Sequence, residues 1–157
     1  MTLRKQQGTT TVEFAIVATM LFTVIFGVME VGRALFVWNT LTEATRRGAR
    51  VAAVCPVNHP SIARVAVLGD PLGGDTSPMI HGLSTANVQL EYLDDSGTPT
   101  AAFPEIRYVR VSINNYQHRL MIPLLAQTIT APPFSTTLPA ESLGYIPELD
   151  LRQCYGV

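Results

Sequence analysis

The sequence predicts an α+β protein in which a long N-terminal helix packs on a small antiparallel sheet. All eleven prolines lie at or beyond Pro56, so the first third of the 157-residue chain lacks the residue that most often breaks a helix. In the remaining two-thirds, short segments of alternating polarity are separated by turn residues such as Gly, Pro and Asp. The two parts therefore meet between Cys55 and Pro56.

The predicted helix covers residues 9–54, and its first half is apolar enough to cross a membrane. The segment from Phe14 to Met29 carries no charge, and apolar character resumes from Ala34 to Trp38. A spanning helix needs about 20 predominantly apolar residues, so we expect a transmembrane segment at about residues 14–38. Trp38 suits the outer membrane–water interface. The alternative is a buried core helix of a soluble protein.

The residues that flank the apolar segment predict its orientation and its contacts. Arg4 and Lys5 precede it, which favours a cytoplasmic N-terminus and an extracytoplasmic head. In the second half of the helix, Glu43 can pair with Arg46 or Arg47 at the spacing of neighbouring turns. We expect one face of this half to pack on the head, namely Val31, Leu35, Trp38, Leu41 and Thr45.

Residues 55–157 predict the α+β head. A short helix is expected from Ser61 to Leu68, with Ser61 as its N-cap, followed by a glycine-rich loop over residues 69–82. The segment from Leu120 to Ile129 is apolar and predicts either a short helix or an irregular crossover. Alternating polarity predicts three strands, at about Val88–Tyr92, Ile106–Asn114 and Phe134–Leu143.

Two cysteines, Cys55 and Cys154, fall outside the predicted transmembrane segment. With the head in an oxidising compartment, a disulfide between them is expected, and two unpaired thiols are the alternative. Such a bridge would tie the end of the long helix to the C-terminal part of the chain.

Composition and motifs disfavour several function classes. Hydrophobic residues make up 47%, charged residues only 15%, and the net charge is −1, which disfavours disorder and binding of nucleic acid through overall basic charge. There is no G-x-S-x-G, P-loop, C-x-x-C or H-E-x-x-H motif. We therefore expect no enzyme, no catalytic residues, no cofactor and no metal.

The individual histidines and aspartates fit the same expectation. The three histidines lack metal-ligand spacing and are expected at the surface or in loops: His59, His81 and His118. Four aspartates could in principle bind calcium but match no EF-hand loop, so we interpret them as turn carboxylates: Asp70, Asp75, Asp94 and Asp95.

Three short motifs carry a resemblance to a known family. Gly8-Thr9-Thr10-Thr11-Val12-Glu13-Phe14, with Arg4 and Lys5 upstream, resembles the processing site of type IV pilin-like proteins. Glu30-Val31-Gly32-Arg33 and Arg47-Gly48-Ala49-Arg50-Val51-Ala52-Ala53 resemble segments of TadE-like proteins. These are the minor pilins or pseudopilins of tight-adherence (Flp) pilus systems. The specific match covers residues 4–54.

The resemblance implies a pilin-like fold and a prepilin peptidase that cuts between Gly8 and Thr9, with residues 1–8 as the leader. It further implies an assembly role for Glu13 and Phe14, in which Glu13 pairs with the new amine of Thr9 in a neighbouring subunit. The alternative for Glu13 is a place in the first helical turn, where the helix dipole favours an acid.

The implied partners are the prepilin peptidase, other pilins, platform proteins of pilus assembly and the membrane, without nucleic acid. The implied location is the inner (cytoplasmic) membrane, crossed once, with incorporation into the pilus. A second interpretation of the same sequence is a signal-anchored extracytoplasmic binding domain that is never cleaved.

Overall fold

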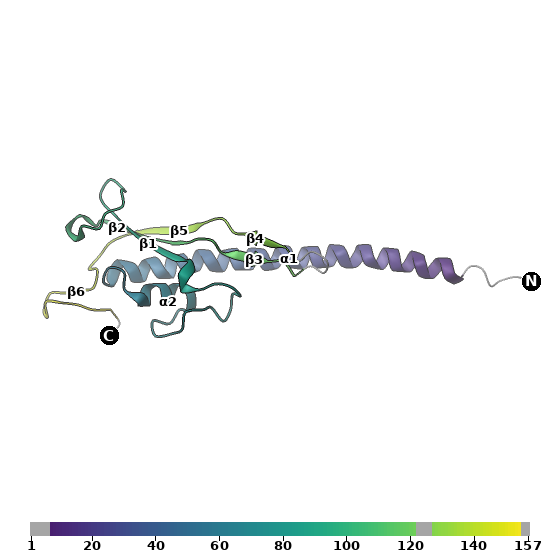
Figure 1. The fold of residues 1–157 in the computed structure, drawn as a ribbon, viewed down its shortest axis with the longest axis horizontal. Helices are drawn as coiled ribbons and strands as arrows, with labels where there is room; N and C mark the ends of the chain where they lie inside the picture. Colours follow the sequence, from purple (N-terminus) through teal and green to yellow (C-terminus); the bar gives the residue numbers. More distant parts are fainter. Residues whose placement is uncertain (1–6, 122–126, 155–157) are drawn as a thin grey trace, which may run out of the picture.

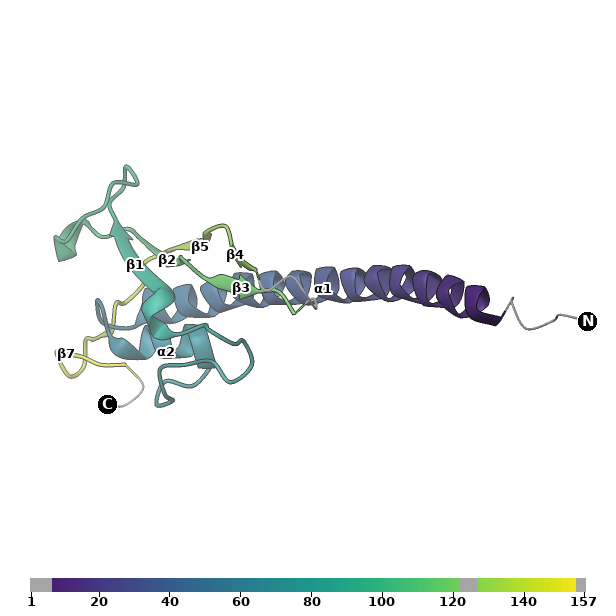
Figure 2. The ribbon, with the colours of Figure 1, turned by 45° about the vertical axis from the view of Figure 1, so that its right-hand side comes forward.

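The computed structural model describes residues 7–121 and 127–154, so Arg4 and Lys5 of the predicted leader lie outside the described residues. Helix α1 (Gln7–Val54) runs without interruption for 48 residues. Its C-terminal half is covered by the head, while its N-terminal half projects bare from it (Figures 1 and 2). The predicted α+β architecture, a long apolar helix with a small antiparallel sheet, is confirmed.

The main sheet lies along the C-terminal half of α1. Its strands are β1 (Val88–Leu93), β2 (Tyr108–Ile113) and β5 (Phe134–Pro139), in the antiparallel order β1-β2-β5. The alternation that predicted β2 reflects real burial, since Val109, Val111 and Ile113 are fully buried beneath the sheet. All three predicted strands exist, and β2 and β5 are shorter than predicted.

Helix α2 (Pro60–Leu68) packs beside α1, and its start differs from the prediction. His59 is the N-cap rather than Ser61, because the His59 side chain accepts a hydrogen bond from the Ser61 N–H at 3.3 Å. Pro60 occupies the first helical position, where a missing N–H costs nothing, so the helix begins before Ser61. Gly69, with φ of 78°, ends α2 in the left-handed conformation.

Several short elements were not predicted. They are the 3₁₀ helices η1 (Thr85–Asn87) and η2 (Phe103–Glu105), the hairpin of β3 (Gln117–Arg119) with β4 (Thr128–Thr130), and the hairpin of β6 (Tyr145–Ile146) with β7 (Leu151–Arg152). Elements of two or three residues are too short to show a period in the sequence. Of the segment interpreted as a helix or crossover, residues 122–126 lie outside the described residues.

The face of α1 that packs on the head is only partly the predicted one. Leu41 and Thr45 are fully buried, and Thr45 Oγ1 lies 2.9 Å from Thr136 Oγ1 of β5. Val31, Leu35 and Trp38 are instead exposed. The buried stripe is built from smaller side chains about one residue position away, and it includes Val37, Ala44, Gly48, Ala49 and Ala52.

The predicted disulfide joins Cys55 to Cys154, with 5.0 Å between the Cα atoms. Both cysteines are buried in the same apolar cluster as Ala52 and Ile62. The bridge therefore ties the chain just beyond the end of α1 to the segment after β7, across 99 residues of sequence.

Candidate functional site

The bare half of α1, residues 8–29, exposes nearly all of its large apolar side chains. Phe14 is 74% exposed, and Met20, Phe22 and Val28 are exposed in the same way. This helix is long and apolar enough to cross a membrane. Such a continuous apolar surface is unfavourable in water and suits lipid or the apolar surfaces of other helices.

The two polar side chains in the middle of this half are satisfied within the helix. The Thr19 hydroxyl donates to the Ala15 carbonyl at 2.7 Å, and the Thr23 hydroxyl donates to the Thr19 carbonyl at 2.8 Å. Hydroxyls bonded back to the preceding turn need no water. The bare half is therefore compatible with an environment that offers no hydrogen-bond partners.

The predicted processing site lies at the beginning of this bare half. Gly8 and Thr9 belong to the first turn of α1, and a Cβ at Gly8 would meet nothing within 4 Å. The folded chain therefore gives no packing reason for glycine at position 8. Glu13 and Phe14 are both exposed, and within residues 7–121 and 127–154 Glu13 has no ion-pair partner.

The head first contacts α1 at Glu30, which is buried although it is charged. The Glu30 carboxylate accepts hydrogen bonds from the Arg33 guanidinium, from the Met121 N–H at 3.1 Å and from His118 Nε2 at 3.0 Å. Arg33 also donates to the Arg119 carbonyl oxygen. A buried carboxylate is tolerated where several donors surround it, so this cluster fastens the β3–β4 hairpin to α1.

Only part of this contact between α1 and the β3–β4 hairpin could be predicted from the sequence. The pairing of Glu30 with Arg33 follows from their spacing. The prediction that every histidine is a surface or loop residue is wrong for His118, which is buried in β3. Strand β3 has only three residues, and His118 is separated from Glu30 by 88 positions, so no local pattern indicated the contact.

The second family motif lies where α1 meets α2 and β2. A Cβ at Gly48 would lie 2.9 Å from the Ala66 Cβ and 3.1 Å from Val111 Cγ1, so only glycine allows this close approach. Ala49 is fully buried, and Arg50 is exposed. By contrast, a Cβ at Gly32 would meet nothing within 4 Å, so the two motif glycines serve different purposes.

Arg47 and Arg46 differ in what they contact. Arg46 forms the predicted pair with Glu43, at 3.8 Å, on the exposed side of α1. Arg47 instead reaches the C-terminal end of α2, where its Nη2 donates to the Ala66 carbonyl at 3.5 Å. A cation there is favoured because the last carbonyls of a helix carry partial negative charge.

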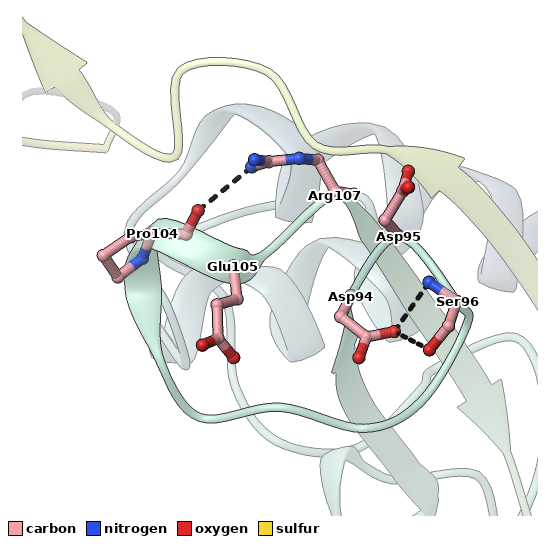
Figure 3. A pocket seen from close by; sticks show the side chains of 6 residues that line it. All are labelled: Asp94, Asp95, Ser96, Pro104, Glu105 and Arg107. Atoms are coloured by element: carbon pink, nitrogen blue, oxygen red, sulfur yellow. Dashed lines mark hydrogen bonds between the residues drawn. The ribbon is translucent and has the colours of Figure 1, made fainter.

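A separate hollow of about 500 Å³ lies between the turn after β1 and η2 (Figure 3). Asp94 accepts hydrogen bonds there from the Ser96 hydroxyl at 2.7 Å and from the backbone N–H groups of Ser96 and Thr98. Hydrogen bonds from Ser96 and Thr98 lower the pKa of Asp94 below its ordinary value. Asp94 is thus the turn carboxylate that the sequence indicated.

Two of the other three predicted turn carboxylates also have structural contacts. Asp70 accepts from the Leu72 N–H at 3.0 Å, and Asp75 lies 3.7 Å from Arg64. Beside Asp95 in the hollow of Figure 3, the Glu105 carboxylate accepts from Thr100, and Arg107 donates to the Pro104 carbonyl at 3.1 Å. In the described part of the chain, no group of three or more His, Cys, Asp or Glu is arranged to hold a metal ion.

Comparison with known proteins bears on the N-terminal segment. Residues 8–50 match the family described as TadE-like protein. Neither a curated protein nor a solved structure matches the chain. The matched segment covers about a quarter of the chain and contains Glu30–Arg33 and the first four residues of the Arg47–Ala53 motif. The resemblance to TadE-like proteins is therefore confirmed for residues 8–50, which form nearly all of α1.

Proposed function

We propose that this chain is a minor pilin or pseudopilin that a prepilin peptidase cleaves and that takes part in assembling a tight-adherence (Flp) pilus. The observation that carries the proposal is the bare half of α1. It exposes a continuous apolar surface, begins at the Gly8–Phe14 motif and ends where Glu30 joins the head. A structural subunit, rather than an enzyme, is what this arrangement supports.

The length of the bare half fits a membrane. After cleavage at Gly8, the helix from Thr9 to Met29 has about 21 residues and a length of about 31 Å at 1.5 Å per residue. The hydrocarbon core of a bilayer is about 30 Å thick. We therefore place the lipid-spanning segment at residues 9–29. It ends before the 14–38 segment expected from the sequence, because from Glu30 onward one face of α1 is covered by the head.

Glu13 supports an assembly role because of what surrounds it. A carboxylate at the centre of a lipid-spanning helix costs roughly 2.5–3.5 kcal/mol on insertion scales, and a smaller cost applies to Glu13 near one end of the segment. Within the described residues it has no ion-pair partner to offset that cost. The amine of Thr9 in a neighbouring subunit, created by cleavage, would supply the missing positive charge.

Cleavage is tested with two glycines that have equally open surroundings. The chain is co-expressed with a prepilin peptidase, and its intact mass is measured for the wild type, Gly8→Val and Gly32→Val. We expect the wild type and Gly32→Val to lose residues 1–8 and Gly8→Val to remain whole. If the wild type stays whole while a control prepilin is cut, the uncleaved signal-anchored domain becomes the better description.

The assembly role is tested with two exposed glutamates of α1. Glu13→Ala should be cleaved normally but should reduce piliation, because it removes the charge that pairs with the neighbouring amine. Glu43→Ala is the matched control, since the one ion pair of Glu43 within the described residues is with Arg46 of the same helix. Equal piliation by the two variants would argue against a role for Glu13.

A further inference from the structure

The end of the head nearest the bare half of α1 is formed by the β3–β4 hairpin, whereas β6 and β7 lie at the opposite end (Figures 1 and 2). Met121 directly follows β3 at this end of the head. Its N–H donates to Glu30, and its side chain lines a hollow of about 350 Å³ together with Phe26 and Met29. Met121 therefore lies beside the last turn of the segment placed in lipid under the proposed function.

Two methionines at this end of the head are unusually exposed. Met121 is 74% exposed and Met79 is 71% exposed, although each belongs to the head rather than to the bare half of α1. Exposed apolar side chains at the depth of the membrane–water boundary favour contact with lipid over water.

Two arginines lie beside these methionines. Arg33 and Arg119 line a second hollow, of about 180 Å³, together with Met79, His81 and Tyr116. In the described part of the chain, the Arg119 guanidinium forms no hydrogen bond or ion pair. Among the described residues that line the two hollows, Glu30 is the single acid.

This chemistry matches a phospholipid headgroup. A guanidinium binds phosphate oxygens through parallel hydrogen bonds, and the apolar stem of arginine can lie along lipid while its head reaches the phosphate layer. The patch thus places exposed methionines beside the Arg119 guanidinium, which has no partner in the described residues, and beside Arg33, which is already bonded to Glu30. Apolar and positively charged groups side by side match the apolar and charged layers at the surface of a bilayer.

We propose that the patch formed by Arg33, Met79, Arg119 and Met121 is a binding surface for phospholipid headgroups of the membrane that α1 crosses. The proposal rests on the membrane-spanning segment assigned above. The patch continues the lipid-facing surface of α1 sideways onto the head. It thereby holds the head against the outer surface of the membrane while the subunit is still anchored there.

The test uses single tryptophan reporters in the full chain, reconstituted into phosphatidylcholine nanodiscs with acyl chains brominated near the headgroup. In a Trp38→Phe background, the reporters are Met121→Trp, Leu149→Trp and Phe22→Trp. Leu149 is the matched control, because it is 62% exposed but follows β6 at the far end of the head. Phe22 lies in the bare half of α1 and reports insertion of the helix.

We expect bromine to quench the reporter at position 121 at least about twofold more than the reporter at position 149, because only the former lies at headgroup depth. Equal, weak quenching at positions 121 and 149, with strong quenching at position 22, would overturn the patch and leave the anchor intact. Weak quenching at position 22 would overturn the anchor and the patch together.

The charge of the patch is tested separately. Replacing part of the phosphatidylcholine with phosphatidylglycerol should increase quenching at position 121, and Arg119→Glu should remove that increase. Arg50→Glu is the control, since Arg50 is also an exposed arginine of this chain but lies about 30 Å along α1 from Glu30. If Arg50→Glu and Arg119→Glu behave alike, specific binding of headgroups by the patch is overturned.

Discussion

The two halves of α1 have the same secondary structure but different surroundings. From Gly8 to Met29, large apolar side chains point outward all around the helix, and none of them is buried. From Glu30 to Val54, one stripe of mostly small residues is buried under the head, while arginines and large apolar residues lie on the other faces. The two halves of α1 therefore differ in how much of their surface the head buries, and not in their secondary structure.

The difference teaches how one helix serves two environments. The bare half needs apolar surroundings supplied by lipid or by other helices, whereas the covered half buries its apolar stripe against the head of the same chain. The bare half gives way to the covered half at Glu30, whose buried carboxylate accepts hydrogen bonds from α1 and from the β3–β4 hairpin. Four predictions challenge or refine this comparison.

The largest expected effect comes from removing the disulfide that closes the covered part. The double variant Cys55→Ala with Cys154→Ala should destabilise the head by roughly 4–5 kcal/mol, because the bridge closes a loop of 99 residues in the unfolded chain. Urea unfolding of the full chain in detergent micelles measures the loss. Thiol alkylation of the wild type with and without reductant should differ by two sites, and equal labelling would contradict the bridge.

The second prediction compares one leucine from each half. Leu41 is fully buried and Leu21 is 56% exposed. Leu41→Ala should lower the free energy of unfolding of the head by about 2–5 kcal/mol, because it leaves a cavity between α1 and the sheet. Leu21→Ala should leave that quantity unchanged. Amide exchange of the β2 residues reports the stability of the head, and a similar loss for both variants would contradict the division at Glu30.

The third prediction concerns the boundary itself. Glu30→Gln keeps the shape of the side chain but removes the charge that accepts from Arg33, His118 and Met121. Hydrogen bonds to a charged group contribute about 1.5–3 kcal/mol, so the β3–β4 hairpin should detach more readily. Faster exchange of the Met121 amide is expected, with β1 and β2 unchanged. Unaltered exchange at Met121 would show that Glu30 does not fasten the hairpin.

The smallest change in stability is expected for Tyr92 of β1, whose hydroxyl accepts a hydrogen bond from the Asn58 N–H at 2.8 Å. Tyr92→Phe should lower the free energy of unfolding of the head by about 1 kcal/mol. Burial raises the pKa of Tyr92 above its ordinary value of 10.0, so the folded head favours the neutral phenol. The resulting stability is present below pH 10 and is lost as the pH rises through the raised pKa.

Unfolding measured between pH 9 and pH 11 checks this sign. The wild type should lose stability in this range more steeply than Tyr92→Phe. Tyr116, whose pKa burial also raises, contributes to the slope of both proteins and so leaves a residual dependence in the variant. Identical slopes would mean that folding does not raise the pKa of Tyr92.

The sequence predicted what short-range patterns determine. The absence of proline predicted α1, and the alternation of Val109, Val111 and Ile113 predicted β2. The bridge across 99 residues was predictable because two cysteines allow only one pairing within the chain. Other long-range contacts left no such pattern. His118 and Met121 lie 88 and 91 positions from Glu30, and nothing near either residue indicates that they meet the carboxylate.

The predicted contact face of α1 failed for a related reason. Val31, Leu35 and Trp38 are apolar and recur at helical spacing, which normally indicates a buried face. In this chain they are exposed, and the head packs instead on smaller residues such as Ala44 and Gly48. Periodicity identifies an apolar face but does not distinguish a face that covers a core from one that meets lipid or another subunit.

The most direct test of the account is the mass of the chain in two cell fractions, sheared pili and membranes. Cells with an intact tight-adherence system should yield a chain that begins at Thr9 in at least one of them, with the disulfide formed. A chain that begins at Met1 and occurs only in membranes, in cells that cleave another prepilin, would contradict the central claim that this protein is a processed pilus subunit.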